Sequence, residues 1–158
     1  MYILRVTLQV GNKQYHGHRF ILAKSSDVFR QMLYDPQWME SGQTDLKLSE
    51  TGECETVFDR FLRYLYKAEI DISTSTAVGI LCLADKYNVS SLKLLCVEYM
   101  IRNTRSPLVQ NAVEWYSWAK ALHLPSLQQQ CAKTIAWNYG RLINSEQWLH
   151  IYGFSLCG

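Results

Sequence analysis

The sequence has neither a strong net charge nor a long hydrophobic run. With 16 Lys and Arg against 14 Asp and Glu, its net charge is +2, which argues against the broad electrostatic attraction that nucleic-acid binding requires. No apolar stretch approaches the roughly 20 residues that a membrane-spanning helix needs. Residues 1–10 have Arg5 within their apolar run and no small-residue cleavage site, so we expect no signal peptide there. These absences predict a folded protein that acts neither on nucleic acid nor in a membrane.

Motifs of the common enzyme classes are absent as well. The chain contains no glycine-rich phosphate loop, no His-Glu-x-x-His sequence and no nucleophile elbow. His16 and His18 are separated by one residue, but no third ligand of a suitable type is near them in sequence, so we expect no metal site. Glu53 and Glu55 stand where the first turn of a helix favours negative charge. We therefore expect no catalytic residues and no cofactor.

The cysteines do not form a recognisable pairing pattern. There are five of them, an odd number, and no two form a Cys-x-x-Cys motif. Cys82, Cys96 and Cys131 lie among apolar residues in helical stretches, which is typical of reduced thiols in a core. Cys157, near the end, is expected to be a thiol outside any formed site. Reduced thiols favour a reducing compartment, and so a cytoplasmic location.

The residues that are present predict a small sheet at the start of the chain. The apolar content of 48% and the charged content of 19% are typical of a globular domain. Residues 3–10 alternate between apolar and polar side chains, which is the period of a half-buried strand. Gly11-Asn12 then predicts a tight turn, with positive φ at both residues, into a second strand over residues 13–16. A third, short strand is predicted over residues 45–48.

Helical spacing dominates the remaining sequence. Residues 18–33 predict two short helices separated by the polar hinge Ser25-Ser26-Asp27, whose side-chain oxygens can cap the second helix. Phe20, Ile21 and Leu22 form an apolar cluster in the first of them. From residue 53 onward, apolar residues recur at the spacing of buried helix faces. The chain therefore combines a small sheet with a larger number of helices.

A second group of helices is predicted after a polar, basic link at residues 102–105. Ser106-Pro107 has the cap and first-turn residues of a helix start. His123-Leu124-Pro125 predicts a break, and residues 126–139 predict the partner helix. The chain then stops without a helix cap or a charged end, so we expect these helices to be the first part of a larger helical module.

Taken together, these segments resemble a BTB/POZ domain. The matching motifs follow the order and spacing of that family over residues 3–102 and are Val6-Thr7-Leu8, Gly17-His18-Arg19-Phe20-Ile21-Leu22, Ser26-Asp27-Val28-Phe29, Phe61-Leu62-Arg63-Tyr64-Leu65-Tyr66 and Leu83-Ala84-Asp85-Lys86-Tyr87. Residues 106–152 resemble the N-terminal part of a BACK domain. Their motifs are most similar to the galectin-3-binding protein-like subgroup and are Trp115-Tyr116, Cys131 and Ala136-Trp137-Asn138. The resemblance implies an α+β fold, in which a cluster of helices flanks a small sheet, followed by a partial all-α BACK module and a tail at residues 153–158.

The resemblance also implies a function. BTB/POZ domains are non-enzymatic protein–protein interaction domains, and those that bind cullin-3 act as adaptors in ubiquitin ligase assemblies. Such members carry a hydrophobic-x-Glu pattern in the loop that Trp38-Met39-Glu40 occupies here, so cullin-3 is the implied partner. Trp38 would enter an apolar pocket while Glu40 accepts a hydrogen bond at its edge. The alternative is the oligomerisation or scaffold module of an exported protein, which would require a longer form with a signal peptide.

Two departures from the family bear on self-association. Long family members have an extra helix before the first strand, which exchanges between protomers, whereas here Met1 stands at the strand itself. The family usually places an Asp before Val-Thr-Leu, in a charged pocket with the His-Arg of the next helix. Here Arg5 takes that place beside His18 and Arg19, and like charges repel. We expect at most a weak homodimer, formed through helical faces.

Overall fold

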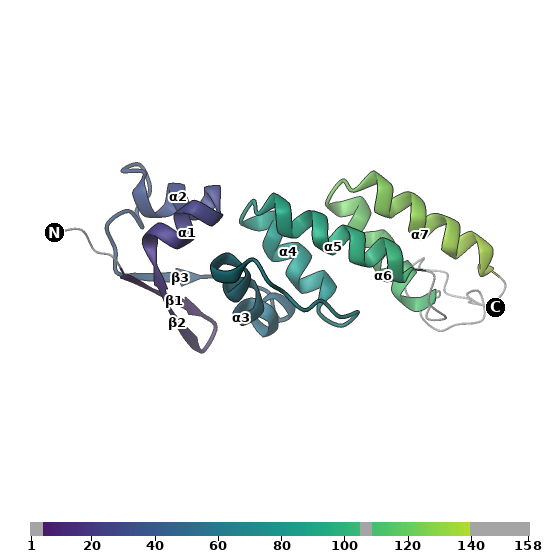
Figure 1. The fold of residues 1–158 in the computed structure, drawn as a ribbon, viewed down its shortest axis with the longest axis horizontal. Coiled ribbons are helices and arrows are strands. Elements are labelled where there is room, and N and C mark those ends of the chain that lie inside the picture. Colours follow the sequence, from purple (N-terminus) through teal and green to yellow (C-terminus); the bar gives the residue numbers. More distant parts are fainter. Residues whose placement is uncertain (1–4, 105–108, 140–158) are drawn as a thin grey trace, which may run out of the picture. The chain divides into compact units, whose positions relative to one another are not determined.

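Alternating side chains at the N-terminus form the predicted sheet. In the computed structural model, which describes residues 5–104 and 109–139, strand β1 spans Arg5–Val10 and buries its three apolar side chains. Strand β2 (Lys13–His18) pairs with it antiparallel, and β3 (Asp45–Leu48) pairs with it in parallel. The order across the sheet is β2-β1-β3 (Figure 1). Helices account for the other regular elements, so the α+β class is confirmed.

The hairpin between β1 and β2 differs from the prediction in two details. Gly11 has a φ of +54°, but Asn12 does not have a positive φ. Strand β2 also runs to His18 rather than ending at His16. Gly17 and His18 continue the pairing, opposite Val6 and Arg5 of β1. Gly17 is buried, and a Cβ there would lie 3.2 Å from the Cδ1 of Leu22.

Two short helices follow the sheet, as predicted. Helix α1 spans Arg19–Ser25 and α2 spans Asp27–Tyr34, with Ser26 between them. The Ser26 Oγ accepts a hydrogen bond from the Phe29 backbone N–H at 3.1 Å, which is the expected N-cap contact. Phe20, expected in an apolar cluster, is 70% exposed, whereas Leu22 is buried. Neighbouring helical positions face different directions, so the cluster cannot be buried as a whole.

Three longer helices complete this part of the chain: α3 (Gly52–Lys67), α4 (Ala77–Lys86) and α5 (Ser90–Asn103). The predicted apolar stripe of α3 buries Phe58 and Phe61 completely. Both rings lie next to Tyr87 at the end of α4, and Tyr87 stacks on Phe29 with ring centroids 4.5 Å apart. These aromatic contacts join α2, α3 and α4 in one core.

The chain divides into two compact units within α5, at Cys96 and Val97. In the second unit, α6 (Val109–Ala121) and α7 (Pro125–Trp137) pack on each other as a helical hairpin. His123, in the predicted break, has a φ of +53°. The fully buried side chains of the hairpin are Ala112, Trp115, Ala119, Leu127 and Cys131. The predicted helix start at Ser106-Pro107 and the predicted tail lie outside the described residues.

No helix in residues 5–104 and 109–139 is long and apolar enough to cross a membrane. In the same ranges, no group of three or more His, Cys, Asp or Glu side chains is arranged to hold a metal ion.

Candidate interaction site

The loop between α2 and β3 presents two large apolar side chains to solvent. Trp38 is 41% exposed and Met39 is 86% exposed, while Glu40 is half-buried. The backbone here folds through successive turns, with hydrogen bonds from Trp38 N–H to Asp35 O and from Ser41 N–H to Trp38 O, both at 3.0 Å. The exposed side chains therefore stand on an ordered backbone rather than on an extended strand.

A buried arginine ties this loop to the helices. Arg19, at the start of α1, is only 5% exposed. Its Nη1 donates to the Gln43 carbonyl oxygen at 2.8 Å, and its Nη2 donates to the carbonyl oxygen of Leu33 near the end of α2. The guanidinium also lies over the Tyr34 ring, 5.5 Å from the centroid. Because the five donors of a guanidinium form a rigid fork, Arg19 joins the two ends of the loop that carries Trp38, Met39 and Glu40.

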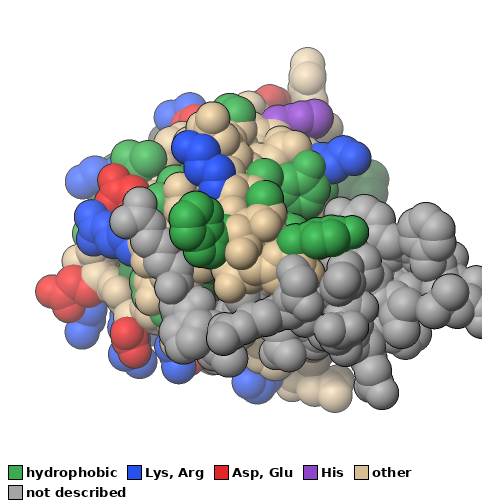
Figure 2. Space-filling model, turned by 90° about the vertical axis from the view of Figure 1, so that its right-hand side faces the viewer, with side chains coloured by type: hydrophobic (Ala, Val, Ile, Leu, Met, Phe, Trp, Pro, Cys, Tyr) green, Lys and Arg blue, Asp and Glu red, His purple; other side chains and the backbone are tan. Residues whose placement is uncertain are grey.

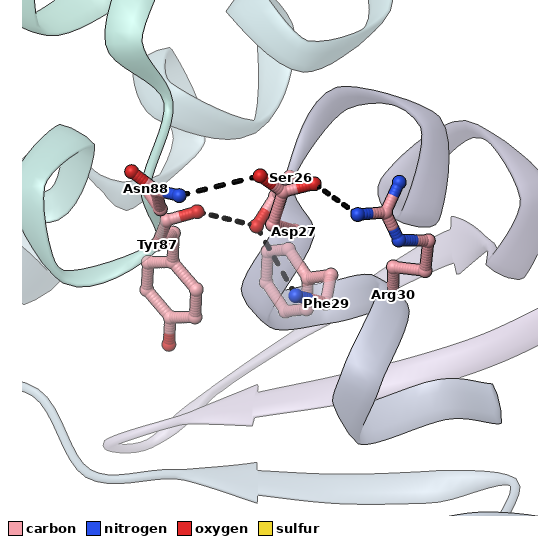
Figure 3. A network of polar contacts seen from close by, with 6 residues as sticks. All are labelled: Ser26, Asp27, Phe29, Arg30, Tyr87 and Asn88. Atoms are coloured by element: carbon pink, nitrogen blue, oxygen red, sulfur yellow. Dashed lines mark hydrogen bonds and ion pairs between the residues drawn. The ribbon is translucent and has the colours of Figure 1, made fainter. Parts of the chain in front are cut away.

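The other end of α2 is held by a polar network at Ser26 (Figure 3). The Ser26 Oγ donates to the Tyr87 carbonyl oxygen at 2.6 Å and accepts from the Phe29 N–H. Asn88 donates to the Asp27 carboxylate at 3.3 Å. Helix α2 is thus connected at its start to the end of α4 and at its end to Arg19, which limits the positions that the loop can take.

A buried carboxylate organises the far side of this core. The Glu50 side chain is 2% exposed and accepts hydrogen bonds from Lys86 Nζ at 2.9 Å and from the Tyr87 hydroxyl at 2.6 Å. Burial raises the pKa of the Tyr87 hydroxyl, and the hydrogen bond to Glu50 and its negative charge act in the same direction. Tyr87 therefore resists ionisation at alkaline pH.

This environment makes stability depend on pH in the alkaline range. An unfolded tyrosine ionises near pH 10, whereas folded Tyr87 stays neutral because its pKa is raised. Its contribution is fully present below about pH 10 and is lost as the pH rises toward the folded pKa. We expect the free energy of unfolding, measured by urea denaturation, to fall above that pH, and Tyr87→Phe to reduce the slope. Equal slopes in the unsubstituted protein and Tyr87→Phe would contradict this assignment.

Two of the three residues expected to correspond to the family's charged pocket line one cavity, and the third makes hydrogen bonds to backbone carbonyls. Arg5 and His18 are cross-strand partners in the β1–β2 pair. Both line an open cavity of about 490 Å³ at the edge of the sheet. The His18 backbone N–H donates to the Tyr66 hydroxyl at 2.7 Å. The Arg19 guanidinium instead donates hydrogen bonds to the carbonyl oxygens of Leu33 and Gln43, and so stabilises the loop between α2 and β3.

Large hydrophobic side chains are also exposed in the second unit. Figure 2 shows hydrophobic side chains at the surface of the described residues, beside Lys and Arg side chains. Trp137 in α7 is 91% exposed. Ala136 beside it is exposed as well, because the buried face of α7 is formed by Leu127 and Cys131.

Comparison with known protein families identifies the family of the first unit. Residues 4–104 match the family model for the BTB/POZ domain. The chain belongs to the BTB/POZ family. BTB/POZ domains are protein–protein interaction domains.

Relatives extend the comparison along most of the chain. The sequence is 33% identical over 140 residues to BTB/POZ domain-containing protein 17 of Xenopus laevis, covering 88% of this chain and 28% of that protein. It is 32% identical over 112 residues to galectin-3-binding protein of Bos taurus, covering 70% of this chain and 20% of that protein. It is 25% identical over 142 residues to Kelch-like protein 41a of Danio rerio, covering 90% of this chain and 23% of that protein. The chain thus spans less than a third of each of these relatives, and the similarity to galectin-3-binding protein noted from the sequence is confirmed.

The residue that supports the loop was not predicted, because Arg19 was expected in a charged pocket. Glu50, which holds Lys86 and Tyr87, had no expected role either. One signal was available: Arg19, Leu22 and Ala23 are spaced as one helix face, and all three are buried. An arginine on a buried face needs hydrogen-bond acceptors. Which acceptors it finds depends on the path of a loop more than ten residues away.

Proposed function

We propose that this BTB/POZ domain is an adaptor module that binds the N-terminal domain of cullin-3 through Trp38, Met39 and Glu40. The observation that carries the proposal is the exposure of Trp38 and Met39 on a loop whose backbone is held by Arg19. An ordered loop loses less conformational freedom on binding than a flexible one, so more of the contact energy becomes affinity. Glu40 adds a carboxylate beside the apolar pair, which suits a polar contact at the rim of a pocket.

We also propose domain boundaries for this module. Residues 3–102 form the BTB/POZ domain, residues 106–152 the beginning of a BACK domain, and residues 153–158 a tail. The packing of α6 on α7 and the burial of Trp115 support a helical module after the BTB/POZ domain. An adaptor with reduced thiols belongs in a reducing compartment, which places this form in the cytoplasm.

The test is a binding titration of the whole chain against the N-terminal domain of cullin-3. We expect saturable binding, weakened at least about tenfold in Kd by Glu40→Lys, since reversing a charge in a polar contact costs more than about 1.4 kcal/mol. Glu69→Lys makes the same charge change at an exposed position outside the loop, so it should bind like the unsubstituted chain.

Two results would refute this role. A folded, monodisperse chain that does not bind cullin-3 has no such function. Equal weakening by Glu40→Lys and Glu69→Lys would mean that net charge, and not the loop, controls binding.

Met39→Ala, which removes an 86% exposed side chain, should weaken binding without changing the free energy of unfolding.

A second function, a self-associating scaffold, is favoured by the similarity to galectin-3-binding protein. Phe20 on α1 is 70% exposed and could contact a second copy. Light scattering over a range of protein concentrations distinguishes the two functions. A molar mass equal to that of one chain at every concentration supports the adaptor. A dimer that dissociates when Phe20 is replaced by serine (Phe20→Ser) supports the scaffold.

A further inference from the structure

Helices α3 and α4 touch at a glycine. A Cβ added to Gly79 would lie 2.8 Å from the carbonyl oxygen of Glu53 and 2.9 Å from Cγ2 of Val57. Most helix pairs keep their axes about 8–10 Å apart because side chains lie between them. At Gly79 no side chain intervenes, so the two backbones are in contact, and short side chains near this point can meet.

Two cysteines flank this contact. Cys54 follows Glu53 on α3, is 6% exposed, and donates through its Sγ to the Gly79 carbonyl oxygen at 3.7 Å. Cys82 stands three residues after Gly79, on the same side of α4, and is only partly buried. Because the Cys54 Sγ reaches the Gly79 carbonyl, one helical turn before Cys82, the two cysteines are neighbours across the contact between α3 and α4. Disulfides require Cα atoms within about 7 Å and Cβ atoms that face each other, a geometry that a direct backbone contact between helices provides.

We propose that Cys54 and Cys82 form a reversible intramolecular disulfide between α3 and α4 when the protein meets a hydroperoxide such as hydrogen peroxide. The thiolate of Cys54 attacks one peroxide oxygen; an S–O bond forms, the O–O bond breaks, and the departing hydroxide takes up a proton to become water. Cys54 is then a sulfenic acid. The sulfur of Cys82 attacks the Cys54 sulfur, and the hydroxyl group leaves as water with the Cys82 proton. Two thiols are oxidised by two electrons in all, and one peroxide is reduced to two waters.

The surroundings assign different roles to the two sulfurs. The hydrogen bond from the Cys82 thiol lowers the pKa of Cys54, with a smaller contribution in the same direction from the Thr51 hydroxyl. The same contact with Cys54 raises the pKa of Cys82, and burial adds to it. Cys54 also stands in the first turn of α3, where a helix N-terminus favours a thiolate. We therefore assign the first reaction to Cys54 and the resolving step to Cys82.

The remaining described cysteines serve as controls. Burial alone raises the pKa values of Cys96 and Cys131 to about 12. Both are fully buried, and no partner thiol lowers the pKa of either. They should stay reduced under conditions that oxidise the pair.

The experiment treats the whole folded chain with stoichiometric hydrogen peroxide. The chain is then unfolded in urea, its remaining thiols are blocked with iodoacetamide, and it is digested with trypsin without reduction. Cleavage after Lys47, Arg60, Lys67 and Lys86 separates the pair into peptides 48–60 and 68–86. Mass spectrometry should find these two peptides linked and three of the five cysteines alkylated. Dithiothreitol should restore all five thiols, and the oxidised chain should melt at a temperature higher by roughly 5 °C or more.

Variants test the assigned roles. Cys82→Ser, whose hydroxyl can still donate a hydrogen bond to the Cys54 sulfur, should leave a sulfenic acid on Cys54 that dimedone traps. Cys54→Ala should give neither dimedone labelling of Cys82 nor linked peptides. Cys96→Ala and Cys157→Ser should keep the linked pair. The proposal is overturned if the unsubstituted chain, still folded by circular dichroism, yields no linked peptides, or if the links involve other cysteines instead.

Discussion

Replacing Gly79 by valine should lower the free energy of unfolding by about 3 kcal/mol or more, the upper end of the range for overpacking a core. Any Cβ at this position meets the carbonyl oxygen of Glu53 at 2.8 Å. That oxygen belongs to a helix backbone, so it cannot move aside as a flexible side chain would. Valine adds two branches beyond the Cβ, and α3 and α4 have to separate to accept them.

Alanine at position 79 should show the same effect in a milder form. Alanine favours a helix over glycine by about 0.5–1 kcal/mol, which opposes the steric cost, and we expect a net loss of about 1–2 kcal/mol. Gly52→Ala is the matched control, because a Cβ at Gly52 would meet no atom within 4 Å. Urea denaturation of the three variants tests the contact. If Gly79→Val were as stable as Gly52→Ala, the backbone contact between α3 and α4 would not exist.

Replacing Arg19 by methionine should cost about 2–4 kcal/mol of stability. The change leaves the carbonyl oxygens of Leu33 and Gln43 without their donors, and an unsatisfied buried acceptor costs about 1–3 kcal/mol. Methionine keeps much of the apolar volume of the arginine stem, so the loss reports mainly on these hydrogen bonds. Lysine should fall in between, since its single ammonium cannot reproduce the fork of a guanidinium.

The loop should loosen in the same variant. We expect Arg19→Met to reduce the hydrogen-exchange protection of residues 35–43 and to weaken cullin-3 binding, although Arg19 itself is buried. Arg30→Met is the control, because the Arg30–Asp27 pair is more than half exposed on both sides and such pairs contribute less than about 1 kcal/mol. Unchanged protection of the loop in Arg19→Met would show that other contacts hold it.

The interaction site was predictable in part. The pattern Trp38-Met39-Glu40 could be found in the sequence because it depends on three adjacent residues in a loop of known place in the family. Exposure of Trp38 and Met39 is consistent with that prediction, but the role of these residues in binding stays a prediction. The support for the loop was not predictable, because Arg19 reaches acceptors 14 and 24 residues away, and no local pattern encodes such a contact.

The sequence by itself determined the local elements. The period of two in residues 5–10, the strand at Asp45–Leu48 and the Ser26 cap between α1 and α2 all follow from neighbours along the chain, and the structure has each of them. Short-range spacing is enough here because a strand or a helix repeats every few residues.

Only the tertiary structure decided which distant residues meet. It buried Arg19, exposed Phe20, brought Cys54 beside Cys82 and made Gly79 a point of backbone contact. In the sequence, Cys54 and Cys82 are two thiols among five, and Gly79 is one glycine inside an apolar helix. Their contact depends on how closely α3 and α4 approach, and that distance is set by the packing of whole helices rather than by the residues next to each cysteine.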